Sequence, residues 1–262
     1  MKKILSMLLA SVMVLSLAAC SNQPAEENSS SQSSSEQTAS LETTYPVTIT
    51  DALGREVTIE EEPERLVSGY YITTSYLAAL DLDEKLVGIE AKADTRELYK
   101  LAAPELPSLP NVGSLKQFNL ETCVSTEPDL VILSAKVPDA VAKLEELGIP
   151  VIAVNPESEK EFKETISMIG TACNVQERAN ELTESYDKAI ADLAAKLEGV
   201  EPARVYLGGN SAFLSTAGPA MFQDLLIRGA GAENVASEIT DTYWATVSYE
   251  QLLAWNPDAI IL

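Results

Sequence analysis

Histidine is absent from this sequence of 262 residues. Sites for bare zinc or manganese usually include an imidazole ligand, and hydrolases of the Ser-His-Asp and Cys-His types need one as their base. The sequence also has no Gly-x-Ser-x-Gly motif and no phosphate-binding P-loop. We therefore do not expect free-metal capture, triad hydrolysis or nucleotide binding through a P-loop.

Basic residues are scarce. Lys and Arg number 18 against 40 Asp and Glu, which gives a formal net charge of −22. Nucleic-acid phosphates call for clustered Lys and Arg, so nucleic acid is not an expected partner. An acidic balance of this size is typical of a soluble surface and says little about the ligand.

Cysteine is nearly as rare, with three in the chain. Cys123 and Cys173 lack metal-site spacing. Cys123 lies on the apolar side of a predicted helix, which favours a buried small hydrophobe and leaves a disulfide as the alternative.

Only one long apolar run is present, and it is at the start of the chain. Lys2 and Lys3 precede an uncharged run over 4–17 that is too short for a permanent membrane helix, and Leu-Ala-Ala-Cys20 follows. This pattern predicts a lipoprotein signal peptide over 1–19 with Cys20 as the lipidated residue. An ordinary secretory signal is the alternative.

The next segment, 20–43, is rich in Ser, Glu and Gln and lacks the apolar residues needed for a core. We interpret it as a disordered tether between the lipid and a folded domain. The expected location is extracytoplasmic, lipid-anchored to the cell membrane of a bacterium of the Gram-positive type.

A repeated segment indicates two similar α/β lobes. NLETCVSTEPDLVIL begins at Asn119 and SYEQLLAWNPDAIIL begins at Ser248. Each copy has a helix-capping residue, a glutamate two places on (Glu121, Glu250), an amphipathic helix, Pro-Asp and an apolar strand. The wide separation fits two lobes better than a solenoid, whose repeats are shorter.

The predicted first lobe, 44–157, has a hairpin at 47–59 and four short apolar runs suited to buried parallel strands. These runs are at 66–67, 86–89, 130–133 and 151–154, with helical patterns between them around 74–80, 119–125 and 139–147. Alternation of this kind indicates βαβ units.

Residues 158–199 are predicted to form connecting helices, with a long one over 176–198 that could brace the two lobes or pack on one alone. The second lobe, 200–262, has predicted strands at 204–207, 234–236 and 259–262 and a helix at 221–228. The first copy of the repeat is followed by a further helix and strand and the second is not, so we expect this lobe to be incomplete and the chain to continue past Leu262.

Five stretches together resemble the substrate-binding lipoproteins of ATP-binding-cassette importers for iron-siderophore complexes, haem and cobalamin. They are DALGREVTI (51–59), the segment over 119–132, LEELGIPVIAV (144–154), STAGPAMFQDLL (215–226), and GAGAENVA with VSYEQLLAWNPDAII (229–261). The resemblance implies two α/β lobes with parallel sheets joined by one long helix, a monomer with the ligand between its lobes, and no enzymatic activity. It also implies that one glutamate in each lobe, here Glu121 and Glu250, docks against permease arginines. Without the resemblance, both would be first-turn carboxylates favoured by the helix dipole.

Ligand contacts in open parallel sheets come from loops at the carboxyl ends of strands. On this basis the candidate ligand-binding residues are Tyr70, Tyr71, Arg96, Lys136, Asn210, Tyr243 and Trp244. Their aromatic rings and cations would suit a bulky anionic chelate, although packing or solvent exposure is the simpler role for each one singly.

The predicted function is capture of an iron complex, a ferric siderophore, and its delivery to the permease and ATPase of an importer. The protein needs no cofactor, because any metal arrives inside the ligand. Cobalamin or another corrinoid is the second candidate ligand and haem the third, since without histidine only Tyr or Met could serve as axial ligand. A two-lobed extracellular hydrolase is the remote alternative, and it lacks a catalytic base.

Lipid anchoring generates the first testable prediction. Cys20→Ala is expected to release the protein from the membrane fraction or to leave its precursor unprocessed, because the thiol that carries the lipid is gone. Metabolic labelling with a fatty-acid probe checks this, and normal labelling of the variant would contradict it.

Overall fold

The computed structural model describes residues 41–209 and 212–262. The predicted signal peptide, Cys20 and nearly all of the tether lie outside the described residues, as does Asn210. Below, 41–172 is called the N-terminal part and 204–262 the C-terminal part, and each is described by itself.

The N-terminal part begins with the predicted hairpin. Strands β1 (Val47–Thr50) and β2 (Glu56–Ile59) pair in antiparallel register, as the alternating sequence predicted. Ile49 is buried on one face of the hairpin, while the Thr48 and Thr58 hydroxyls meet at 3.3 Å on the exposed face. This period of two is that of a strand pair with one face on a core.

Asp51 ties the hairpin turn to the central sheet. Its carboxylate accepts hydrogen bonds from the backbone N–H groups of Leu53 (2.9 Å), Arg55 (3.1 Å) and Ala153 (3.1 Å), and it forms an ion pair with the Arg55 guanidinium. Gly54 lies in the left-handed region at φ 73°, which glycine tolerates without strain. DALGREVTI is therefore a structural motif that closes a turn and fastens it to a sheet edge.

The central sheet of this part is parallel, with the strand order β4-β3-β7-β8. Its strands are β3 (Leu66–Ser68), β4 (Leu86–Ile89), β7 (Leu130–Ser134) and β8 (Val151–Val154). All four strands were predicted from short apolar runs. Such continuous runs are expected where a sheet is covered on both faces.

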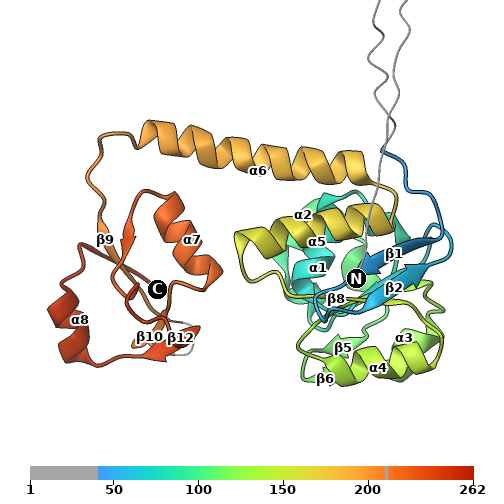
Figure 1. The fold of residues 1–262 in the computed structure, drawn as a ribbon. Helices are drawn as coiled ribbons and strands as arrows, with labels where there is room; N and C mark the ends of the chain where they lie inside the picture. Colours follow the sequence, from blue (N-terminus) through green and yellow to red (C-terminus); the bar gives the residue numbers. More distant parts are fainter. Residues whose placement is uncertain (1–40, 210–211) are drawn as a thin grey trace, which may run out of the picture. The chain divides into compact units, whose positions relative to one another are not determined.

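Two separate cores lie on the two faces of this sheet, because side chains alternate along a strand. Leu130 and Ile132 belong to the core that includes helix α1 (Tyr71–Ala79), helix α5 (Glu159–Ala172) and the hairpin. Val131 and Leu133 belong to the core that includes helices α3 (Leu120–Ser125) and α4 (Pro138–Glu146). Figure 1 shows these helices around the strands.

The remaining elements of the N-terminal part are short. They are α2 (Glu97–Ala102), α3 (Leu120–Ser125), α4 (Pro138–Glu146), the strand pair β5 (Gly113–Ser114) and β6 (Gln117–Phe118), and single 3-10 turns at Asp83–Lys85, Ala93–Thr95 and Leu106–Ser108. The sequence patterns predicted α1, α3 and α4 but not α2, which is too short to show a periodic pattern.

Helix α6 (Gln176–Lys196) follows α5 and packs against it, close to the predicted bounds of the long helix. Ala179, in the first turn of α6, is buried. Position 170 of α5 must be glycine, because a Cβ at that position would come within 2.6 Å of the Ala179 side chain. Its role as a brace between lobes stays a prediction. Within the described residues, no helix combines the length and the apolar content needed to cross a membrane.

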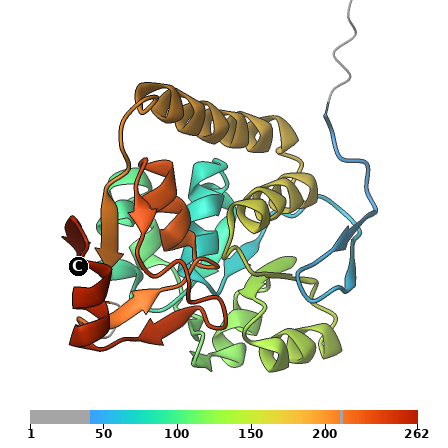
Figure 2. The same cartoon turned by 60° about the vertical axis from the view of Figure 1, so that its left-hand side comes forward.

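The C-terminal part contains a second parallel sheet in the order β11-β9-β13, seen with its helices in Figure 2. Its strands are β9 (Arg204–Leu207), β11 (Glu233–Asn234) and β13 (Ala259–Ile261), and its helices are α7 (Phe222–Gly229) and α8 (Tyr249–Trp255). The α/β class with parallel sheets is thus confirmed.

The C-terminal part also holds an antiparallel pair that the sequence did not predict, β10 (Ser215–Ala217) with β12 (Trp244–Thr246). Each has three residues, below the length at which alternation is a usable signal. Trp244, expected in a loop before the helix, begins β12 instead.

Cys123 agrees with the favoured expectation of a buried small hydrophobe, and Cys173 has the same environment. Cys123 and Cys173 are free and buried, and burial raises the pKa of each thiol to about 12. Cys123 and its repeat counterpart Leu252 are both core residues. They therefore act as small hydrophobes in the interior.

Asp51 generates a prediction about stability. Asp51→Ala is expected to lower the free energy of unfolding by about 2–4 kcal/mol, because buried N–H groups and the Arg55 guanidinium lose a charged acceptor. Urea unfolding followed by circular dichroism measures the change. The exposed Asp94→Ala serves as control and should alter stability by less than about 0.5 kcal/mol. Equal effects of the two substitutions would contradict the assigned role.

Candidate functional site

The carboxyl ends of the parallel strands in the N-terminal part gather the polar candidates on one edge of the sheet. Tyr70 and Tyr71 follow β3, Glu90 follows β4, Lys136 follows β7 and Glu157 lies shortly after β8. In open α/β sheets this is the edge at which ligands bind. The sequence predicted Tyr70, Tyr71, Arg96 and Lys136, and missed Glu90 and Glu157.

The two tyrosines after β3 have different environments. Tyr71 opens helix α1 with 44% of its surface exposed, whereas Tyr70 is only 5% exposed and packs in the core. Their rings meet edge to face at 5.2 Å. Gly69, just before them, is required for a different contact, since a Cβ there would lie 2.3 Å from a methyl of Leu133. Tyr71 is therefore the ring that this loop offers to a ligand.

A buried carboxylate stands behind Tyr71. Glu90 is 5% exposed and accepts hydrogen bonds from the Thr74 hydroxyl (2.6 Å), the Tyr99 hydroxyl (2.8 Å) and the Arg96 Nε (3.1 Å). The Arg96 guanidinium carbon lies 4.4 Å from the centre of the Tyr71 ring. The cation is thus held between a carboxylate and an aromatic face.

The second cation on this edge is Lys136, which forms an ion pair with Glu157. Its side chain is 55% exposed, and its backbone N–H is 3.2 Å from the Ser134 hydroxyl. An exposed pair of this kind contributes little to stability and can exchange partners easily. Lys136 is therefore available to a ligand, with Glu157 as its competitor.

Three tyrosines of the N-terminal part, Tyr70, Tyr76 and Tyr99, have raised pKa values. Burial, followed by the charge of Glu157, raises the pKa of Tyr76 to about 12 and raises the pKa of Tyr70 further. Burial and the neighbouring Glu90 likewise raise the pKa of Tyr99. These phenols can donate hydrogen bonds in the neutral form, and a tyrosinate is disfavoured here.

The candidates in the C-terminal part lie on and before strand β12. Tyr243 is 58% exposed, and Trp244 is half-buried where it pairs with Ala217. The Thr242 hydroxyl donates to the Trp244 carbonyl at 3.0 Å, which shapes the turn into the strand. Tyr243 and Trp244 can therefore present aromatic surface.

Glu121 and Glu250 occupy equivalent places on two short helices. Each is the second helical residue and is exposed. The preceding caps are formed as predicted: the Asn119 side chain accepts from the Thr122 N–H and the Ser248 hydroxyl from the Gln251 N–H. Hydrogen bonds from its own backbone N–H and from Ser248 lower the pKa of Glu250. Both helices thus present a carboxylate at their first turn.

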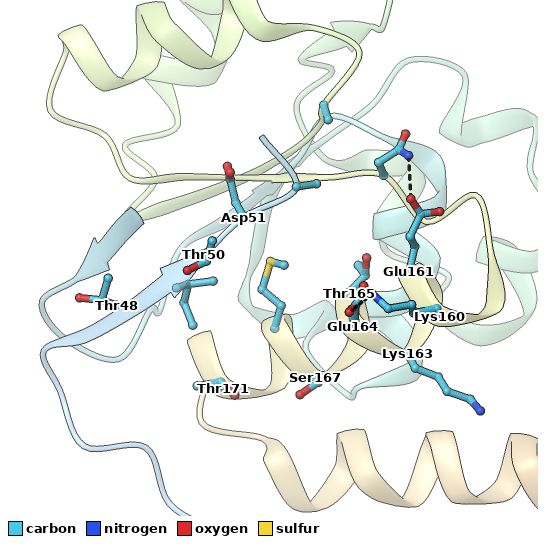
Figure 3. Close-up of a pocket in the computed structure, with 15 residues that line it drawn as sticks. Thr48, Thr50, Asp51, Lys160, Glu161, Lys163, Glu164, Thr165, Ser167 and Thr171 are labelled. Atoms are coloured by element: carbon cyan, nitrogen blue, oxygen red, sulfur yellow. Dashed lines mark hydrogen bonds and ion pairs between the residues drawn. The ribbon is translucent and has the colours of Figure 1, made fainter. Parts of the chain in front are cut away.

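A hollow of about 870 Å³ lies elsewhere in the N-terminal part, between β1 and α5. Figure 3 shows Thr48 and Thr50 from the strand on one side and Ser167 and Thr171 from the helix on the other. The Lys160 ammonium at its rim is paired with Glu164. None of the predicted ligand-binding residues lines this hollow, and we do not take it as the ligand site.

Three or more acidic or cysteine side chains do not come together as a possible metal site anywhere in 41–209 or 212–262. The candidate site on the N-terminal sheet edge instead combines the exposed Tyr71 ring with two cations paired with carboxylates. Such a set can bind a ligand through stacking, hydrogen bonds and charge.

Comparison with known proteins places this chain among binding proteins. A family model described as periplasmic binding protein matches residues 66–262. The Bacillus subtilis protein named uncharacterized ABC transporter substrate-binding lipoprotein YvrC is 30% identical over 98% of this chain and 78% of its own length.

Relatives with named ligands differ in what they bind. A vitamin B12-binding protein of Salmonella choleraesuis is 30% identical over 63% of this chain and 62% of its own length. The petrobactin-binding protein YclQ of Bacillus subtilis is 23% identical over 100% of this chain and 80% of its own length. The solved structure of the Haemophilus influenzae molybdate-binding protein MolA, bound to molybdate, has a TM-score of 0.69 at 26% identity and covers 82% of this chain and 73% of that one.

Proposed function

Because the chain belongs to the periplasmic binding protein family, whose members here are solute-binding components of ABC importers rather than enzymes, we propose that its solute is an iron complex, a ferric siderophore. The protein binds this complex outside the cytoplasm and passes it to the importer permease. The observation that carries the proposal is the Arg96 guanidinium, whose carbon lies over the exposed Tyr71 ring, 4.4 Å from its centre, at the carboxyl edge of the sheet.

Ferric siderophores are bulky chelates with anionic oxygen donors around the metal. An aromatic face beside a guanidinium matches that chemistry, because the ring packs on apolar parts of the chelate and the cation pairs with its oxygens. The relative named for petrobactin supports the same ligand class over the full length of this chain.

Cobalamin is the second candidate. The observation in its favour is the 30% identity to a vitamin B12-binding protein. Corrin is large and flat and would rely on the aromatic candidates Tyr71, Tyr243 and Trp244 more than on Arg96. The two ligands are therefore distinguished by how strongly binding depends on the cation.

A ligand screen by intrinsic fluorescence tests the proposal. We expect a ferric siderophore to change the emission of Trp244, one of two tryptophans, and to bind more tightly than cyanocobalamin, haem or molybdate. Trp244→Phe should remove most of the signal change, whereas Trp255→Phe, a core position, should not. Tight binding of cyanocobalamin with none of the ferric siderophores would contradict the proposal and select the second candidate.

Lipid attachment at Cys20 and permease docking through Glu121 and Glu250 belong to the same proposal. A lipid anchor would keep the binding protein at the membrane that holds its permease. The two glutamates are exposed at the same place in both copies of the repeat, as paired docking charges require. Exposed carboxylates can form charge-assisted bonds to permease arginines.

Docking generates a prediction in cells. Glu121→Lys combined with Glu250→Lys, introduced in the gene at its own locus, is expected to abolish uptake of the solute and to leave its affinity unchanged, because the charge that meets the permease is reversed. Transport of the radiolabelled iron complex and binding to the purified protein are measured side by side.

The control carries the same change of charge at other exposed glutamates, Glu146→Lys with Glu201→Lys, and should transport normally. If the docking variant transports like the wild type, the two glutamates are helix-start carboxylates only. If both variants lose transport equally, net charge rather than docking is responsible.

A further inference from the structure

We propose that Glu90 is a positioning residue that fixes the Arg96 guanidinium over Tyr71, so that the outer edge of the guanidinium receives a ligand group with two closely spaced anionic oxygens. Carboxylate and tetrahedral oxyanion groups share this chemistry. The inference rests on the proposed function. It adds that the Arg96 guanidinium recognises the anionic oxygens of the ligand.

The surroundings of Glu90 show that its carboxylate is built to hold a fixed position. A buried carboxylate is costly unless its oxygens are hydrogen-bonded and its charge is paired. Oε2 accepts from the Thr74 hydroxyl, while Oε1 accepts from the Tyr99 hydroxyl and from Arg96 Nε. The Thr74 hydroxyl also reaches the buried Ser68 hydroxyl at 2.8 Å, at the end of β3. The carboxylate therefore joins the ends of strands β3 and β4 to helices α1 and α2 and has little freedom to move.

Arg96 uses only one of its donors in this arrangement. Its Nε bonds to Glu90, and its two terminal nitrogens have no hydrogen-bond or ion-pair partner among the residues that the structure describes. The side chain is 32% exposed, and its guanidinium carbon lies 4.4 Å from the Tyr71 centroid and 5.8 Å from the Tyr99 centroid. A guanidinium held at Nε leaves its terminal N–H groups for paired oxygens.

A comparison with Lys136 shows why Arg96 is the cation that can orient a bound ligand. Lys136 is a flexible point charge on an exposed side chain, and its only ion-pair partner in the described chain is the half-buried Glu157. Arg96 is fixed from behind by a buried carboxylate and from one side by an aromatic face. Preorganisation of this kind lowers the entropy lost on binding and adds geometric selectivity.

A double-mutant cycle on the complete chain tests the inference by titration calorimetry, with ferric citrate and sodium molybdate as oxyanion probes and cyanocobalamin alongside. Arg96→Gln is expected to raise the Kd for a bound oxyanion probe roughly tenfold or more and to weaken its dependence on salt. Glu90→Gln is expected to raise the Kd roughly fivefold, and to have less than about a twofold effect in the Arg96→Gln background, because it acts through the guanidinium.

Two further variants serve as controls. Glu157→Gln changes the same residue type at the same sheet edge, and its effect should be equal with and without Arg96. Arg96→Lys keeps the charge and loses the planar fork, and a roughly tenfold loss is expected from geometry alone. If Glu90→Gln does not fold, Arg96→Lys still tests the inference, because a substitution of the partly exposed Arg96 leaves the buried carboxylate in place.

Several results would overturn the inference. One is an equal effect of Glu90→Gln in both Arg96 backgrounds, and another is tighter oxyanion binding by Glu90→Gln, which would make Glu90 an opposing charge. A third is failure of both oxyanion probes to bind. If cyanocobalamin then binds and is insensitive to Arg96→Gln, the importer function stands and only this inference fails. If neither the oxyanion probes nor any ferric siderophore, haem or cobalamin binds, the proposed function fails together with this inference.

Discussion

Burial of the parallel sheet on both faces is the constraint on which the N-terminal part depends. Strands β7 and β8 are inaccessible along their whole length, with one core on each face. Every polar group that serves a ligand must therefore lie beyond the ends of the strands, where the chain turns into a helix. This is why Tyr71, Glu90 and Lys136, far apart in the sequence, share one edge.

Buried acidic groups then determine which side chains on that edge are rigid. Asp51 and Glu90 are both almost fully buried, and each is surrounded by donors from separate segments of the chain. Asp224 in the C-terminal part is similar, with bonds from Arg228 and from Asn234. Since a buried charge without partners is strongly unfavourable, each cluster holds its members in one arrangement. Asp51 uses this to fasten a hairpin, and Glu90 uses it to orient a cation.

The chemistry of the candidate site is that of recognition. Burial and nearby carboxylates raise the pKa of the Tyr76 and Tyr99 phenols, and Arg96 and Lys136 are each paired with a glutamate. Such groups supply hydrogen bonds, stacking and local charge to a ligand that is released unchanged, as delivery to a permease requires. The exposed glutamates on α3 and α8, proposed for docking, are different residues from those proposed to contact the ligand.

The sequence by itself determined the elements whose patterns are local. Short apolar runs located the strands of both parallel sheets except β11 (Glu233–Asn234), which overlaps the predicted strand 234–236 only at Asn234. Capping residues located α3 and α8, and the repeat indicated two similar α/β units. These features are set by side-chain periodicity and by hydrogen bonds within a few residues. The strand pair β10 with β12 and the short helix α2 escaped prediction, because three to six residues carry too little pattern. Tyr70 and Tyr71 could not be told apart either, since burial of one neighbour and exposure of the other depends on the packing of the β3 to α1 turn. Only the tertiary structure could bring Glu90 to Arg96, Tyr99 and Thr74, because a buried carboxylate is recognisable only when the distant donors that satisfy it are in place.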